Sequence, residues 1–173
     1  FKAIADASPV PVLLYNVPGR TVVNMNVATI LELSQHPNVI GIKDAGGSFE
    51  QYMELAKRLP EGFLLLSGDD NLVTPMISIG CVGVISVISN AFPVEFAQLT
   101  HAALRGDFKE AARLQFKFLT FDTLLYQESN PVGIKECLAI KGICGSDVRL
   151  PLVKASASLS EKLRLEMMEE GLM

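Results

Sequence analysis

The chain has 173 residues, of which 49 % are apolar and 20 % charged, enough for a folded domain with a hydrophobic core. Its net charge of −4, without any block of Lys or Arg, argues against a nucleic-acid groove. No apolar run approaches the ~18–20 residues of a membrane helix. Three cysteines without metal-type spacing argue against a disulfide framework or a zinc site, and indicate reduced, buried thiols in a cytoplasmic protein.

Four apolar runs rich in β-branched residues are the predicted strands, at residues 10–17, 39–43, 63–68 and 82–89. None alternates cleanly, which is typical of strands buried on both faces. Helical patterns follow them at residues 26–35, 48–59, 72–79 and 93–105. Ser48 and Gln51 have the spacing of a capping box, and Gly80 and Gly106 are suited to end helices. Strands alternating with helices predict an α/β fold with a parallel sheet.

After Gly106 the pattern becomes helical throughout. We expect one long amphipathic helix over residues 107–127, a second opened by Asn130 and Pro131 and ending near residue 141, and a third over 158–170 capped by Ser158. The predicted domains are therefore residues 1–106, with four βα units, and residues 107–173, a C-terminal three-helix extension.

Two architectures fit four βα units: an open doubly wound sheet, or part of a (β/α)₈ TIM barrel, which takes about 250 residues in full. The chain begins at Phe1, within what reads as the end of a helix. We therefore expect it to be part of a longer protein and to form the second half of a barrel. The predicted edge strands, residues 10–17 and 82–89, should then require the other barrel half, or self-association, to cover them.

Polar residues follow each predicted strand: Tyr15-Asn16, Lys43-Asp44, Ser67 to Asp70, and Ser86 with Ser89-Asn90. In a barrel all of them would lie on the C-terminal face, where active sites of this fold are found, and in a doubly wound sheet they would border the ligand crevice.

Three of these residues are candidates for chemistry. Lys43 ends a short apolar strand, and partial burial there would lower its pKa and free the amine to attack a carbonyl; the alternative is a solvated strand-end lysine. Tyr15 can relay protons, or simply pack its ring at the rim. Arg20, between Gly19 and Thr21, can hold a carboxylate or remain solvated.

Other polar residues are interpreted as structural. Asp69 and Asp70 suit helix capping better than a metal site, because no third ligand has suitable spacing. His36 and His101 lie in or beside predicted helices. Gly46-Gly47 offers only a weak phosphate-binding signal without a fuller glycine motif.

Together these segments resemble the dihydrodipicolinate synthase family of pyruvate-dependent, Schiff-base-forming aldolases. The resemblance is carried by YNVPGRT at 15–21, GIKDAGG at 41–47, LLSGDD at 65–70, GVISVISN at 83–90, NPVGIK at 130–135 and RLPLV at 149–153. It extends over essentially the whole chain, with its motifs in the family's order.

The resemblance implies that Lys43 forms a Schiff base with pyruvate and that Tyr15 belongs to a proton relay. It implies that Arg20 holds the carboxylate of aspartate semialdehyde and that Gly68 and Ile85 line the pyruvate pocket. No metal and no organic cofactor is expected. The implied reaction is the first committed step of lysine and diaminopimelate biosynthesis, in a cytoplasmic homotetramer built from tight dimers.

The sequence departs from the family pattern in two places. Asp44-Ala45-Gly46 stands where Glu-Ala-Thr or Glu-Ala-Ser is more usual. The family's first barrel half, with a threonine pair of the proton relay and an inter-subunit tyrosine, has no counterpart here. Rival interpretations are an N-acetylneuraminate lyase or keto-deoxy-sugar aldolase, which resemble YNIPALSG in the first motif without the arginine, and a non-catalytic half-barrel.

Overall fold

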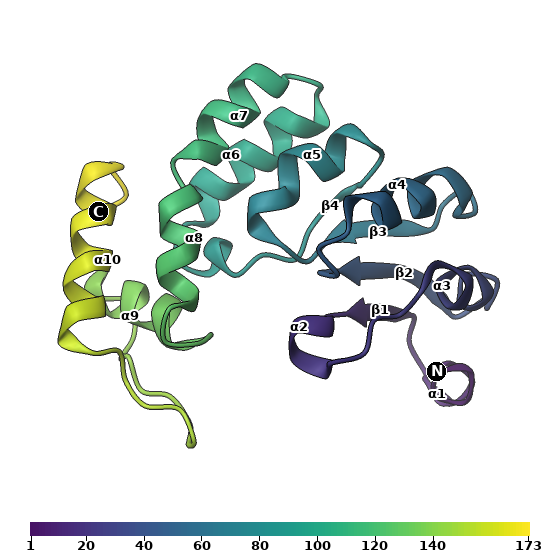
Figure 1. Ribbon diagram of the computed structural model, residues 1–173, viewed down its shortest axis with the longest axis horizontal. Coiled ribbons are helices and arrows are strands. Elements are labelled where there is room, and N and C mark those ends of the chain that lie inside the picture. Colours follow the sequence, from purple (N-terminus) through teal and green to yellow (C-terminus); the bar gives the residue numbers. More distant parts are fainter. The chain divides into compact units, whose positions relative to one another are not determined.

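The first part of the chain holds a four-stranded parallel sheet in the computed structural model, which describes residues 1–173 (Figure 1). Its strands are β1 (Val12–Asn16), β2 (Val39–Asp44), β3 (Leu64–Ser67) and β4 (Gly83–Val84), paired in the order β1-β2-β3-β4. Because all four run in the same direction, their carboxyl ends lie at one edge of the sheet. The predicted α/β fold with a parallel sheet is confirmed.

The last strand is much shorter than predicted. A strand was expected over residues 82–89, but only Gly83 and Val84 pair with β3, and the chain then turns into the 3₁₀ helix η2 (Ile88–Asn90). β3 itself ends at Ser67, whose carbonyl accepts from the N–H of Ile85 (2.9 Å). Beyond that bond β3 offers no further strand backbone, so the apolar run has no partner with which to continue a ladder.

The helices around the sheet largely follow the predicted positions. They are α1 (Lys2–Ala7), α2 (Pro18–Thr21), α3 (Val27–Leu33), α4 (Phe49–Arg58), the 3₁₀ helix η1 (Asp70–Leu72) and α5 (Val73–Ser78). Ser48 caps α4 as expected, since its side chain accepts from the N–H of Gln51. The single turn α2 was not expected; Pro18 begins it, with a φ already suited to a helix.

The sheet has one buried face and one half-exposed face. Leu14, Ile42 and Leu65 are at most 3 % exposed, on the same face as the strand-end residues Asn16 and Asp44. The opposite face was also expected to be buried, but it carries exposed side chains in this chain, with Tyr15 47 % and Leu64 36 % exposed.

Residues Val87–Met173 form a second compact unit, entirely helical. Its helices are α6 (Pro93–Leu104), α7 (Phe108–Phe116), α8 (Leu119–Tyr126), α9 (Val132–Ile140) and α10 (Ala157–Glu169). α6 contacts α7, and α8, α9 and α10 contact one another. None of the helices in the chain is long and apolar enough to span a membrane.

The single helix predicted over residues 107–127 is in fact two helices. The chain tightens at Phe118, whose N–H donates to the carbonyl of Gln115 (3.0 Å), three residues back. Phe118 is fully buried against Phe92 and Phe96, at centroid distances of 6.1 and 5.5 Å, and Phe121 lies 5.0 Å from Phe92. Phe118 and Phe121 thus join one aromatic cluster with Phe92 and Phe96.

The cap of the last helix also differs from the prediction. Ser156, not Ser158, is the N-cap, because its Oγ accepts from the N–H of Leu159 (3.1 Å). Glu128 holds this cap by accepting from the N–H and Oγ of Ser156, at 2.9 and 2.5 Å. The first compact unit ends at Ser86 and the second begins at Val87, so α6 belongs with the helices that follow it. The division at residue 106 into a barrel half and an extension stays a prediction.

Candidate active site

Lys43 and Tyr15 face each other at the carboxyl ends of two adjacent strands. They are register partners in the parallel pairing of β1 and β2, so their side chains stand on the same face of the sheet. Lys43 Nζ lies 4.2 Å from the centroid of the Tyr15 ring, a cation–π arrangement. Lys43 is half-buried and Tyr15 is exposed. An amine and a phenol therefore share one small surface.

Gly68 leaves the space that the Lys43 side chain occupies. A Cβ built on Gly68 would lie 3.1 Å from both Cγ and Cε of Lys43, and 2.9 Å from Cβ of Ala45. The N–H of Gly68 donates to the carbonyl of Asp44 (2.8 Å), which holds the chain after β3 against the end of β2. Ile85 follows β4, the next strand along, and is 41 % exposed.

Arg20 lies in the turn α2, close in sequence to Tyr15 but exposed. It forms no ion pair with any residue of the chain. The turn is closed by Val22, whose N–H donates to the carbonyl of Pro18 (2.9 Å) at a φ of 60°. A β-branched residue in this left-handed conformation is strained, and it lies two residues after the candidate guanidinium.

Behind the Lys43–Tyr15 pair lies a buried layer that the sequence interpretation missed. Asn16 and Asp44 are also register partners, on the opposite face, and Asn16 Nδ2 donates to Asp44 Oδ1 at 2.9 Å. The N–H of Gly46 donates to the same oxygen at 2.8 Å, and Gln51 Nε2 to Oδ2 at 3.2 Å. Asp44 is 0 % exposed, and this burial raises the pKa of its carboxyl group, although the three hydrogen bonds oppose the shift.

The same layer extends to the segment between α2 and α3. Asn16 Nδ2 donates to Asn24 Oδ1, and Asn24 Nδ2 donates to Gln51 Oε1, both at 2.9 Å. The N–H of Met25 donates to Asn16 Oδ1 (2.9 Å), and Gln51 Nε2 donates to the carbonyl of Met25 (3.2 Å). A signal was present in the sequence: Tyr15-Asn16 and Lys43-Asp44 each place polar residues on both faces of a strand end.

The glycine pair before α4 is already engaged within the protein. The N–H of Gly46 bonds to Asp44, and that of Gly47 donates to Tyr52 Oη at 2.6 Å. Tyr52 is fully buried, and burial raises its pKa to about 12. Both donors that a phosphate would need have protein acceptors, so this loop does not have the form of a phosphate cradle.

The remaining polar candidates have structural partners. Asp69 Oδ1 accepts from the N–H of Asn71 (3.0 Å) and caps η1, as expected. His36 Nε2 lies 2.9 Å from Asp6, while its Nδ1 accepts from the N–H of Asn38 (3.1 Å). His36 thus ties α1 to the segment before β2. No group of three His, Cys, Asp or Glu side chains in residues 1–173 has the arrangement of a metal site.

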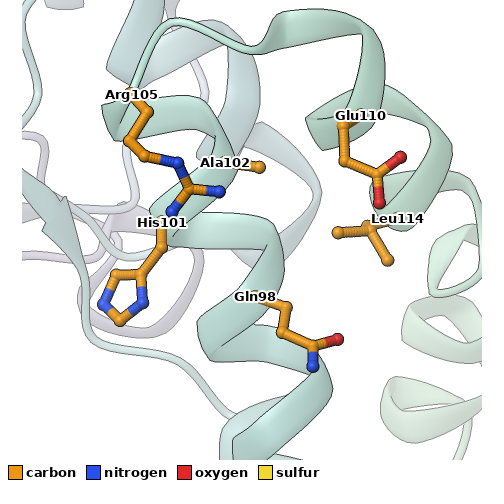
Figure 2. Close-up of a pocket in the computed structure, with 6 residues that line it drawn as sticks. All are labelled: Gln98, His101, Ala102, Arg105, Glu110 and Leu114. Carbon is orange, nitrogen blue, oxygen red and sulfur yellow. The ribbon is translucent and has the colours of Figure 1, made fainter.

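Polar residues line cavities in both compact units. One, of about 300 Å³, adjoins Tyr15 and is lined by Asn16, Thr21, Asn24 and Thr29 among others. The second, of about 220 Å³, lies between α6 and α7. Figure 2 shows its lining residues, which are Gln98, His101 and Ala102 of α6, Arg105 just after it, and Glu110 and Leu114 of α7. The carboxylate of Glu110 is held by Arg113, and no predicted site residue lines this second cavity.

Comparison with known proteins gives a consistent result. The family model described as "Dihydrodipicolinate synthetase family" matches residues 1–169. A Cytophaga hutchinsonii protein named 4-hydroxy-tetrahydrodipicolinate synthase is 48 % identical over 163 residues, covering 94 % of this chain and 55 % of the relative. A Neisseria gonorrhoeae protein of the same name is 43 % identical over 171 residues, covering 99 % of this chain and 59 % of the relative.

Solved structures agree with the sequence relatives. Dihydrodipicolinate synthase from Aquifex aeolicus superposes with a TM-score of 0.94 at 35 % identity, covering 99 % of this chain and 59 % of that one. The chloride-inhibited synthase from Acinetobacter baumannii, solved in complex with pyruvate, gives 0.95 at 34 % identity, with the same coverage. The chain thus spans a little over half the length of the proteins it is similar to.

Proposed function

This chain belongs to the dihydrodipicolinate synthetase family, and we propose that the protein is a lyase that condenses pyruvate with aspartate 4-semialdehyde to give 4-hydroxy-tetrahydrodipicolinate. The observation that carries the proposal is the Lys43–Tyr15 pair: an amine 4.2 Å from the centre of a phenol ring, at the carboxyl ends of parallel strands. An amine supplies the nucleophile and a phenol the proton transfer that imine chemistry needs.

The proposed reaction begins when Lys43 Nζ attacks the ketone carbon of pyruvate. Loss of water from the carbinolamine gives an iminium, which acts as an electron sink. A methyl proton then leaves to give an enamine, whose carbon attacks the aldehyde of the second substrate. The amine of that substrate displaces Lys43 by transimination and closes the ring, so that the enzyme is regenerated. Tyr15 carries protons between these steps.

Three further residues have proposed roles in substrate binding. Arg20, which has no carboxylate partner within residues 1–173, holds the carboxylate of aspartate semialdehyde. Gly68 and Ile85, at the ends of β3 and β4, line the pyruvate pocket beside Lys43. The amine itself supplies the covalent chemistry, and we propose that no metal or organic cofactor takes part.

Other features of the whole protein are also proposed. The sheet of Val12–Val84 is the second half of a (β/α)₈ barrel, and the helices from residue 107 onward are its C-terminal extension. The three cysteines are free and two are buried, which suits a reducing cytoplasm. The whole enzyme is a homotetramer of lysine and diaminopimelate biosynthesis. Analytical ultracentrifugation of the whole protein tests the assembly.

The experiment that tests the proposed function is borohydride trapping. Pyruvate and borohydride should add one reduced pyruvate adduct to the peptide that contains Lys43, and Lys43→Arg should abolish the label. Lys57→Arg, on the exposed part of α4, is the matched control and should be labelled like the wild type. A label on another lysine, with Lys43 unmodified, would overturn the assignment.

A further inference from the structure

The two strand ends at the site carry a matched pair of contacts on opposite faces of the sheet. On one face Lys43 meets Tyr15, and on the other Asp44 accepts from Asn16. Side chains of consecutive strand residues point to opposite faces, so any shift between the ends of β1 and β2 moves both contacts together. The buried Asn16–Asp44 hydrogen bond and the Tyr15–Lys43 contact are therefore coupled through the same two strand ends.

Burying the carboxylate of Asp44 is energetically unfavourable. Asp44 is fully buried, forms no ion pair, and is satisfied by neutral donors alone: Asn16 Nδ2, Gly46 N–H and Gln51 Nε2. Taking a charge out of water without an opposite charge costs free energy that hydrogen bonds only partly recover. An apolar or neutral side chain would pack there at lower cost, so stability alone does not explain this residue.

The local backbone is shaped around the Asn16–Asp44 contact. A Cβ built on Gly46 would lie 2.9 Å from Asp44 Oδ1 and 3.0 Å from Asn16 Nδ2, the two atoms of that hydrogen bond. A side chain at position 46 would therefore push the bond apart. The short side chain of Asp44 and the absence of a side chain at Gly46 are therefore both part of the geometry of this hydrogen bond.

The arrangement also reaches the segment that follows Arg20. Gln51 bonds Asp44 through Nε2, and through the same nitrogen and its Oε1 it bonds Met25 and Asn24. Asn16 bonds both of these residues as well. The carboxylate thus lies at the centre of a network that joins β1, β2, α4 and the segment between α2 and α3.

We propose that Asp44 is a positioning residue: through Asn16 and Gln51 it holds Tyr15 against Lys43 and fixes the segment that follows Arg20. The inference rests on the proposed function, because it assigns Asp44 a role in the imine chemistry at Lys43. Asp44 does not touch the substrate. It acts by fixing the relative places of the groups that do.

Two variants test the proposal from different directions in the intact protein. Asp44→Asn keeps an acceptor for Asn16 and Gly46 but turns an amide N–H₂ toward Gln51 Nε2, donor against donor. Gly46→Ala keeps every hydrogen-bonding group and instead crowds the Asn16–Asp44 bond. It tests the same contact if Asp44→Asn fails to fold. Asp6→Asn, at an exposed carboxylate, and Gly145→Ala, in an exposed loop, are the matched controls.

The measurement is kcat for the condensation per active site, with sites counted by exhaustive borohydride labelling of Lys43. Both variants should label every folded site, while kcat per labelled site falls about 10- to 100-fold, since displacements near 1 Å cost that much. The Michaelis constant for pyruvate should change little, and both controls should match the wild type.

The outcomes separate the two proposals. If wild-type Lys43 takes no label from pyruvate, the proposed function is wrong and this inference is wrong with it. If the wild type is labelled but both variants keep full kcat per labelled site, Asp44 has no positioning role and the proposed function stands. A loss of activity that only matches the loss of folded sites would equally overturn the inference, because it shows a purely structural role.

Discussion

Gly68 packs against the aliphatic stem of Lys43 so closely that a Cβ at position 68 would lie 3.1 Å from both Cγ and Cε of the lysine. The backbone of Gly68 is itself fixed by its hydrogen bond to the carbonyl of Asp44 (2.8 Å). The same Cβ would also lie 2.9 Å from Cβ of Ala45, so the space at position 68 is closed on that side as well. The orientation of the lysine amine therefore depends on the missing side chain at position 68.

Replacing this glycine should impair the amine without abolishing the fold. Gly68→Ala forces the Lys43 stem aside, and we expect the rate of borohydride trapping with pyruvate to fall about tenfold to a hundredfold. Gly145→Ala, where the nearest atom is the flexible end of Asp147 at 3.1 Å, should trap at the wild-type rate. Equal trapping rates for Gly68→Ala and the wild type would mean that Gly68 does not set the orientation of Lys43.

Arg20→Ala should separate the two substrates. Losing a charge-assisted hydrogen bond costs about 1.5–3 kcal/mol, so the Michaelis constant for aspartate semialdehyde should rise from roughly tenfold to more than a hundredfold, with little change for pyruvate. Thermal stability should stay close to the wild type, because Arg20 is exposed and forms no ion pair. Arg149→Ala, also exposed, is the control. Equal damage to both substrates would mean that Arg20 holds its loop rather than a ligand.

The strained Val22 offers a test of backbone energetics. Its side chain is 90 % exposed, so little burial is lost on removing it, and the left-handed conformation costs a β-branched residue ~1–2 kcal/mol. Glycine removes this strain, but the greater entropy of its unfolded chain costs ~0.5–1 kcal/mol. Val22→Gly should therefore raise the unfolding free energy by up to about 1 kcal/mol. Val23→Gly, at 71 % exposure and without positive φ, should be neutral or destabilising. Urea unfolding measures the unfolding free energy of both variants. A larger gain in stability for Val23→Gly than for Val22→Gly would contradict the strain at Val22.

The buried Asp44 should leave a signature in the pH dependence of stability. Burial raises its pKa above the ordinary value of 3.8, so the fold disfavours the charged form. The stability that Asp44 contributes is therefore greatest below pH 3.8 and is lost as pH rises through the raised pKa. Its neighbours Tyr52 and Cys81 keep their protons, since burial raises both pKa values to about 12.

The measurement is the difference in unfolding free energy between the wild type and Asp44→Asn as a function of pH. This difference should fall as pH rises from about 4 and then become flat. A difference that instead grows with pH would show that the hydrogen bonds from Asn16, Gly46 and Gln51 outweigh burial.

The half-barrel proposal has its own test in the isolated 173-residue chain. β1 and β4 are the edges of the sheet, and the face that carries Lys43 exposes apolar atoms at Tyr15, Leu64 and Ile85. Open edges and an apolar face favour association. In sedimentation experiments the isolated chain should self-associate. A stable monomer with a single sharp unfolding transition would contradict this expectation.

Local sequence signals determined the strands and most helices of this protein. Apolar runs predicted β1, β2 and β3, and Ser48 predicted the start of α4, because burial and capping depend on residues close in the chain. These signals failed where contacts with residues far apart in the sequence determine the local structure. β4 stops at two residues because β3 ends beside it, and the helix after Asp107 breaks because Phe118 packs against Phe92 and Phe96.

The site divides in the same way. The sequence alone made Lys43 and Tyr15 candidates, since a polar residue at the end of an apolar strand stands out and strand order places such residues at one edge. Only the tertiary structure placed the amine 4.2 Å from the tyrosine ring, and only it revealed Asn16, Asp44 and Gln51 as one buried network. The reason is physical: hydrogen bonds between residues 28 and 7 positions apart depend on register and helix packing, which no local pattern in the chain records.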